Sequence, residues 1–163
     1  MPASILDNIL ALLDDHGIAC RRLHHRPTYT SADAARVRGE FLHIGGKALL
    51  LKADDRFVLV VISAALRLDS AALRRELGIR RSRFATPAEL ADLTGLVPGS
   101  VPPFGRPILP LTLYVDRSVL ANDRIAFNAA SLTDSIIMSV EDYRRIARIE
   151  KVIDVAQKTT DPA

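Results

Sequence analysis

The residues best suited to chemistry lie in the segment 94–110, which holds five of the nine prolines and three of the eight glycines. Proline lacks a backbone donor and fixes φ, whereas glycine permits positive φ and a close approach of another molecule to the backbone. A stiff loop with free N–H groups is therefore predicted. The amides of Gly99, Ser100, Val101 and Gly105 could converge on an oxyanion or an ester carbonyl, as donors do in acyl-transfer sites. A plain connector is the alternative interpretation.

Two polar side chains at the ends of predicted strands could face the same cavity. Lys47 follows Gly45 and Gly46 and enters an apolar run, where its ammonium group could hold an anion at the edge of a sheet. Its alternative role is that of an ordinary strand-end lysine whose charged head reaches solvent. Ser63 ends the partner strand and could also line the cavity. Its alternative role is a hydroxyl satisfied within the strand end.

A third candidate is Asn128, whose amide could orient a carbonyl or a hydroxyl group, although a role in a turn or a strand ladder fits as well. The four histidines and the single cysteine have neither the spacing of a zinc site nor the partners that would mark a catalytic triad. We therefore expect no structural metal, no cofactor and no internal disulfide.

Capping residues and apolar periodicity predict the helices that must position these candidates. They are a helix after Ser4 that Gly17 ends, and helices over residues 32–37 after Ser31, 70–77 after Asp69, 87–93 after Thr86 and 140–148 after Ser139. Strands are predicted over residues 18–24, 48–51, 57–62, 108–115, 124–128 and 135–140. Residues 116–122 are expected to turn between two strands. Residues 152–155 either prolong the last helix or form an edge strand.

Intermixed strands and helices without a regular βαβ rhythm favour an α+β fold. We predict a single domain over residues 1–163, with a mixed, curved β-sheet or partial barrel flanked by helices. Its core should span about residues 18–156 and its tail, 157–163, should be flexible. No apolar run reaches the roughly 20 residues of a membrane span. Because the N-terminus also lacks a secretory pattern, a cytoplasmic protein without membrane partners is expected.

Arginine is clustered although the net charge is only +3. A guanidinium group suits phosphate, so the clusters together favour a nucleic-acid partner, while ion pairs on solvated helix faces are the alternative for any single cluster. Aromatic residues make up 5% of the chain and tryptophan is absent, which argues against a broad base-stacking platform. The clusters are Arg21-Arg22-Arg26, Arg74-Arg75, Arg80-Arg81-Arg83 and Arg144-Arg145-Arg148.

Several short motifs follow one another between residues 23 and 155. They are H-x-P-x-x-T at residues 25–30, GKALLLK at 46–52, VISA at 61–64, GSVPPFG at 99–105 and IAFN at 125–128. In this order they resemble the YbaK family of aminoacyl-tRNA deacylases, the free-standing relatives of the editing domain inserted in bacterial prolyl-tRNA synthetases. The resemblance covers nearly the whole predicted domain, and the separation of the lysine strand from the loop strengthens it.

The resemblance implies hydrolysis of the ester that joins a wrong amino acid to the 3′ end of a tRNA, without a cofactor or a catalytic metal. It implies that Lys47 positions the terminal nucleotide or the ester and that the loop amides polarise the carbonyl. Aminoacyl-tRNA, bound by its acceptor end, and an aminoacyl-tRNA synthetase are the implied partners. The implied catalytic residues are Lys47, Gly99, Ser100 and Val101, and the implied substrate-binding residues are Tyr29, Thr30, Ser63, Pro103, Phe104, Gly105 and Asn128.

Two other functions remain open on the sequence. A non-catalytic module could retain the fold and bind tRNA or a synthetase, and a hydrolase could act on another small acyl ester. Hydrolysis of mischarged tRNA separates the deacylase from the first, and dependence on the tRNA moiety separates it from the second.

Overall fold

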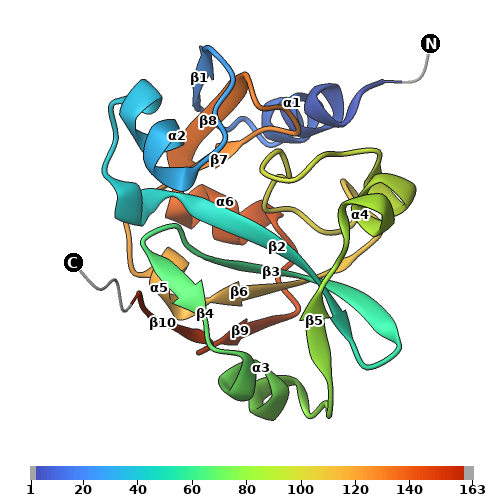
Figure 1. Cartoon of the computed structure of the whole chain (residues 1–163). Helices are drawn as coiled ribbons and strands as arrows, with labels where there is room; N and C mark the ends of the chain where they lie inside the picture. Colours follow the sequence, from blue (N-terminus) through green and yellow to red (C-terminus); the bar gives the residue numbers. More distant parts are fainter. Residues whose placement is uncertain (1–2, 160–163) are drawn as a thin grey trace.

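The computed structural model describes residues 3–159 and contains three sheets flanked by helices (Figure 1). The largest sheet has the strand order β5-β2-β3-β6-β9, in which β2 is antiparallel to β3 and β5, while β6 is parallel to β3 and β9. Its strands are β2 (Gly46–Ala53), β3 (Arg56–Ser63), β5 (Ser82–Phe84), β6 (Thr112–Asp116) and β9 (Lys151–Ile153). The predicted α+β fold with a mixed sheet is confirmed, and in the described chain the sheets do not close into a barrel.

The β2–β3 hairpin forms the centre of the core. Its register runs from Gly46 opposite Ser63 to Ala53 opposite Arg56. Residues 58–62 have 0% of their surface exposed, because the two faces of the sheet are each covered by a separate hydrophobic cluster. Such burial on both faces explains why β3 is a continuous apolar run rather than an alternating one.

Two smaller sheets accompany this hairpin. They are β1-β8-β7 and β10-β4, with β1 (Arg21–His24), β8 (Asp134–Ser139), β7 (Arg124–Asn128), β4 (Leu66–Leu68) and β10 (Ala156–Lys158). Gln157 and Lys158, the first two residues of the expected tail, pair with Arg67 and Leu66 in β4. Residues 160–163 of that tail lie outside the described residues.

Most of the predicted helix caps are confirmed. The side chains of Ser4, Asp69, Thr86 and Ser139 each accept a backbone N–H of the first turn. Thr30 rather than Ser31 caps the second helix, because its hydroxyl accepts from Asp33 N at 3.0 Å. The helices are α1 (Ile5–Asp15), α2 (Ser31–Arg38), the 3₁₀ turn η1 (Leu42–Ile44), α3 (Ser70–Leu77), α4 (Pro87–Thr94), α5 (Arg117–Leu120) and α6 (Val140–Ile146).

Several boundaries differ from the prediction. The short helix α5 occupies the segment expected to be a turn, and α6 ends two residues early, before Arg148 adopts a φ of 52°. The strand expected from residue 108 begins only at Thr112, because the N–H groups of Ile108 and Leu109 both turn back to the carbonyl of Gly105. Residues 151–153 form β9, which settles the ambiguity of the C-terminal segment in favour of an edge strand.

The proline-rich segment after α4 contains neither helix nor strand, as predicted. Its apolar residues anchor it in the core, where the ring of Phe104 lies 5.5 Å edge-to-face from both Phe127 and Tyr143. The hydroxyl of Tyr143 donates to the carbonyl of Pro103 at 2.6 Å. The loop is therefore fixed at its C-terminal half, and its N-terminal half extends from α4. Within residues 3–159, no helix has the length and apolar character to cross a membrane.

Candidate active site

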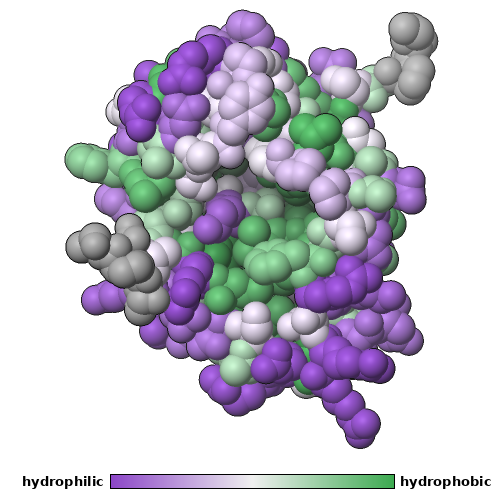
Figure 2. All heavy atoms as spheres, in the orientation of Figure 1, coloured by the Kyte–Doolittle hydropathy of each residue, from purple (hydrophilic) through white to green (hydrophobic). Residues whose placement is uncertain are grey.

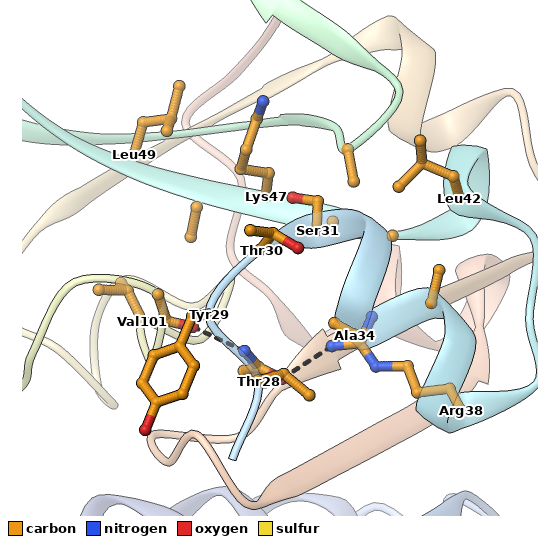
Figure 3. A pocket seen from close by; sticks show the side chains of 17 residues that line it. Thr28, Tyr29, Thr30, Ser31, Ala34, Arg38, Leu42, Lys47, Leu49 and Val101 are labelled. Atoms are coloured by element: carbon orange, nitrogen blue, oxygen red, sulfur yellow. Dashed lines mark hydrogen bonds between the residues drawn. The ribbon is translucent and has the colours of Figure 1, made fainter. Parts of the chain in front are cut away.

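A cavity of about 260 Å³ lies between α2, the start of β2 and the loop 99–101 (Figure 3). In Figure 2 it corresponds to the hollow near the centre of the visible face. Its walls are mostly small or apolar, and polar groups are few. The lining residues are Thr28, Tyr29, Thr30, Ser31, Ala34, Ala35, Arg38, Leu42, Gly45, Gly46, Lys47, Ala48, Leu49, Ala64, Gly99, Val101 and Asn128.

An uncovered stretch of the edge of β2 creates one wall of the cavity. Strand β5 pairs with β2 only at residues 51–53, and Ala85 N extends that contact to the carbonyl of Leu50. At the other end Gly45 forms a bridge with Ala126. Residues 46–49 lie between these contacts without a further partner strand in the described chain, and all four line the cavity. Backbone groups of a strand edge are thus available to a ligand.

The glycines before β2 are required by packing. A Cβ at Gly45 would lie 2.8 Å from Ala64 Cβ, and one at Gly46 would lie 2.7 Å from Ile125 Cδ1. The chain can therefore turn into β2 against its neighbours only because no side chain is present. This close packing sets where Lys47 leaves the sheet.

The loop wall of the cavity is a tight turn at Gly99, whose φ is +88°. Ser100 closes that turn, since its amide and its hydroxyl both donate to the carbonyl of Val97, at 3.1 and 2.8 Å. In contrast, no acceptor within residues 3–159 engages the amides of Gly99 and Val101, and both residues line the cavity. These two N–H groups are the donors that the loop can offer to a ligand.

Asn128 ties this turn to the opposite wall. Its amide nitrogen donates to the carbonyl of Gly99 at 2.6 Å, and its amide oxygen accepts from Arg38 Nη2 at 2.9 Å. The two bonds together fix which way the Asn128 amide faces. This series of hydrogen bonds, from Arg38 through Asn128 to Gly99, therefore holds the turn at a defined position.

Arg38 is a buried cation without a carboxylate partner. The residue is 6% exposed, and its Nε donates to Ser135 Oγ at 2.9 Å, while Ser135 Oγ also contacts His25 Nε2. It forms no ion pair with any described residue. Burial lowers the pKa of Arg38 to about 10. A buried positive charge that only neutral groups solvate favours an anion in the space beside it.

Lys47 supplies a second positive charge to the cavity. Its ammonium group donates to the carbonyl of Leu66 at 2.9 Å, and partial burial lowers its pKa. In Figure 3, Lys47 and Arg38 extend from opposite walls. Because no Asp, Glu, His or Cys lines the cavity, its electrostatic potential is positive. No three such residues come together anywhere in residues 3–159 as a metal site would require.

Six of the predicted site residues line this cavity. They are Tyr29, Thr30, Lys47, Gly99, Val101 and Asn128. Tyr29 is 76% exposed at the rim of the cavity. Thr30 lines the cavity and is also the N-cap residue of α2. Ser100 lies between two lining residues but is itself 2% exposed and committed to its turn. Its predicted direct part in the chemistry is therefore not supported by its contacts.

The other four predicted residues do not line this cavity. The hydroxyl of Ser63 donates to the carbonyl of His43 at 2.8 Å, the satisfied strand-end role. Phe104 and Pro103 belong to the core contacts of Tyr143. Gly105 packs so tightly that an added Cβ would lie 2.4 Å from the carbonyl oxygen of Leu111, so its lack of a side chain serves packing.

Arg38 is the main residue that sequence reasoning missed. It ends α2 just before Gly39, the C-cap, where a basic residue usually faces solvent and interacts with the helix dipole. The partners that reveal its role, Asn128 and Ser135, are 90 and 97 residues away. The only hint in the sequence is that Ala34 and Ala35, the lining residues one turn earlier, leave room beside it.

The fold and the site together define an α+β protein with a cavity at the open edge of a mixed sheet, lined by two cationic side chains and no acidic one. A family model described as the aminoacyl-tRNA editing domain matches residues 25–146. A protein of Escherichia coli K12 named "Multifunctional Ser/Thr-tRNA deacylase ProXp-y" is 36% identical over 152 residues, which are 88% of this chain and 89% of that protein. The chain belongs to the aminoacyl-tRNA editing domain family, which confirms the resemblance found in the sequence.

Solved structures support the same fold. A crystal structure described as a putative trans-editing enzyme for prolyl tRNA synthetase has a TM-score of 0.78 at 22% identity, and covers 96% of this chain and 99% of its own. A second, described only as a hypothetical protein, has a TM-score of 0.80 at 25% identity over 91% of this chain and 99% of its own. The core architecture is therefore shared over nearly the full length of both chains.

Proposed function

We propose that this chain hydrolyses the ester between a mischarged amino acid and the 3′ end of its tRNA, acting in trans. The observation that carries the proposal is the pair of unengaged amides at Gly99 and Val101, two residues that line a cavity with cations and no acid. Membership of the editing-domain family supports it. Oxyanion donors of this kind stabilise the charge that develops on an ester carbonyl during hydrolysis.

Each group then has a defined role. The amides of Gly99 and Val101 donate to the carbonyl oxygen as it becomes an oxyanion. Lys47 and Arg38 create the positive potential that attracts the phosphate next to the terminal adenosine. Asn128 is a positioning residue, because it touches Gly99 rather than the reacting atoms.

The proton transfers require the substrate, since none of the cavity residues is a carboxylate, imidazole or thiol. Water attacks the carbonyl carbon and forms the new C–O bond. As the ester C–O bond breaks, the ribose oxygen that leaves takes up a proton, relayed from the attacking water by the neighbouring ribose hydroxyl. The products are the free amino acid and the tRNA with both hydroxyls restored.

We further propose that serine and threonine are among the amino acids removed. The E. coli relative is named for Ser/Thr-tRNA, and the cavity walls contain small residues such as Ala34, Ala35 and Ala64 that suit a small side chain. Association with an aminoacyl-tRNA synthetase is a separate proposal. Co-elution of the chain with individual synthetases on gel filtration tests it.

A panel of mischarged tRNAs tests the function directly. Single-turnover deacylation is measured for seryl- and threonyl-tRNAs with mismatched anticodons, beside their correctly charged counterparts. Release of the amino acid at a rate above the buffer control supports the proposal. Binding without release from every member of the panel would identify the chain as a non-catalytic tRNA-binding module. Equal hydrolysis of simple acyl esters that lack tRNA would point to a general esterase.

A further inference from the structure

A second depression lies at the far end of the β2–β3 hairpin, where β5 and the chain before it pass the turn. Its lining is strongly basic, and the residues are Lys52, Asp54, Asp55, Arg74, Arg80, Arg81, Ser82 and Arg83. Figure 2 shows hydrophilic side chains gathered in this lower right region, on the same face as the hollow of the cavity. The region is open to solvent along its length.

The charges of this region are only partly neutralised. Arg83 makes a two-pronged contact with Glu89, at 2.8 and 3.0 Å. Arg80 and Arg81 are exposed and form no ion pair with any residue in 3–159. Both charges act on the nearby carboxylate of Asp54 without forming an ion pair with it, so they remain accessible to an external anion.

Asp54 holds these two arginines in place without neutralising them by a side-chain contact. Its Oδ1 accepts the backbone amides of Arg80 and Arg81, at 3.0 and 2.8 Å, and its own amide donates to the carbonyl of Arg81 at 2.8 Å. The amide of Arg81 is the first cause that holds the pKa of Asp54 below its usual value. The hairpin turn thus fixes the backbone from which both guanidinium groups project.

An exposed aromatic ring lies between this basic region and the cavity. Phe84 is 58% exposed and ends β5, in register with Leu51 of β2. Leu49, two residues further along β2, lines the cavity. At about 3.3 Å per strand residue, Phe84 is placed roughly 7 Å along the strand from the cavity wall.

We propose that Arg80, Arg81 and Phe84, named here the β5 strip, bind the single-stranded 3′ end of the tRNA. This inference rests on the proposed function, which places the aminoacyl ester in the cavity. Phe84 stacks on a base close to the terminal nucleotide, and the arginines contact phosphates further from the ester. Aromatic rings beside guanidinium groups are how proteins hold single-stranded nucleic acid without reading its sequence.

Binding of uncharged tRNA tests the strip independently of catalysis. The dissociation constant is measured between 50 mM and 500 mM salt for the wild type and for Arg80→Ala/Arg81→Ala. With a slope of about 0.7 per single-strand phosphate contact, loss of two contacts should lower the salt slope by about 1.4. That change is worth about 25-fold in Kd for each tenfold change in salt. Arg106→Ala/Arg117→Ala removes the same charge from exposed sites outside the strip and outside the other arginine clusters, and should leave the slope nearly unchanged.

The aromatic part of the strip has its own variants. Phe84→Ala should weaken binding by about 5- to 150-fold, because base stacking on an aromatic ring contributes that much. Phe84→Tyr keeps the ring and should restore binding. A tRNA that lacks its single-stranded 3′ end should bind the wild type and Phe84→Ala equally.

Hydrolysis of a short ester separates the strip from the proposed function. Aminoacyl-adenosine has no upstream phosphates, so the strip variants should hydrolyse it at the wild-type rate while their Kd for tRNA rises. An unchanged Kd and salt slope in Arg80→Ala/Arg81→Ala, or equal losses in the control pair, overturns the strip. A wild-type protein that binds tRNA through the strip but hydrolyses no aminoacyl ester refutes the proposed function and leaves the strip intact.

Discussion

The substitution Arg38→Met separates the stability of the cavity from its chemistry. Methionine is similar in length and apolar, so it fills the space of the arginine stem but loses the bonds to Ser135 and Asn128. Two hydrogen bonds from a charged donor contribute about 3–6 kcal/mol. Burial lowers the pKa of Arg38 from 12.5 to about 10, and at 1.36 kcal/mol per pKa unit the buried charge itself costs about 3 kcal/mol.

The two contributions largely offset each other. We therefore expect Arg38→Met to lower the free energy of unfolding by only about 1–2 kcal/mol, in line with other replacements of buried charges by apolar groups. The loss in deacylation rate should be larger than this small loss in stability would suggest. The amide oxygen of Asn128 then keeps only the longer bond from Ser135 Oγ, at 3.3 Å, so the Gly99 turn loses an anchor of about 1.5–3 kcal/mol. The single-turnover rate should fall by about 10- to 100-fold.

Urea unfolding and single-turnover deacylation, measured on the same preparations, check both numbers. Asn128→Ala should give a similar rate loss. With enzyme at a concentration that saturates the tRNA, the contribution of the Arg38 charge to binding no longer limits the rate. The double variant should then be no slower than Asn128→Ala alone, because the two residues act through one contact with Gly99. Arg36→Met, on the exposed face of the same helix, is the matched control and should change neither quantity. A full wild-type rate in Arg38→Met refutes the anchoring role. A stability loss above about 4 kcal/mol would instead make Arg38 a structural support.

Three further substitutions test single features. Lys47→Ala should leave the fold intact and reduce deacylation strongly. Burial lowers the pKa of Lys47, so its ammonium group loses its charge as the pH rises toward that lowered value. The tRNA affinity of the wild type should therefore fall over this pH range, and that of the variant should not. Gly99→Val should reduce deacylation more than Ser100→Ala, because φ at Gly99 is +88°, a conformation that valine rarely adopts. The serine hydroxyl only closes a turn, so Ser100→Ala should lower the free energy of unfolding, measured with urea, by about 1–2 kcal/mol. An inactive Ser100→Ala variant would show that the hydroxyl takes part in the reaction. Gly105→Ala should lower stability by about 2–4 kcal/mol, since its Cβ would meet a carbonyl at 2.4 Å, and normal stability would contradict the packing role.

The sequence was sufficient for features that depend on local signals. The caps at Ser4, Asp69 and Thr86 were predicted correctly because a capping hydroxyl or carboxylate acts within one turn. The three-residue strands β4, β5 and β10 were missed, since so short a strand has no alternating pattern of its own. Their existence depends on the strand that they pair with.

The candidate site shows the same division. The predictions for Lys47 and Gly99 rest on a recognisable pattern in the residues around them, whereas Arg38 is recognisable only through partners distant in the chain. Gly105 illustrates a different difficulty. A glycine needed for contact with a ligand and one needed for contact with Leu113 and its neighbours look alike in a sequence. Only the packing of the loop against the core distinguishes them.

One continuous stretch of chain connects the proposed RNA contacts to the proposed oxyanion donors. Strand β5 leads directly into α4, and α4 leads into the turn at Gly99. The two-pronged contact between Arg83 and Glu89 fastens β5 to the first turn of α4, where Glu89 also accepts the amide of Thr86. Because this segment is held at both ends, binding of the tRNA 3′ end on β5 fixes the ester relative to the amides. Binding energy gained far from the ester can then be used to orient it, so long tRNA substrates should gain in kcat as well as in KM over aminoacyl-adenosine.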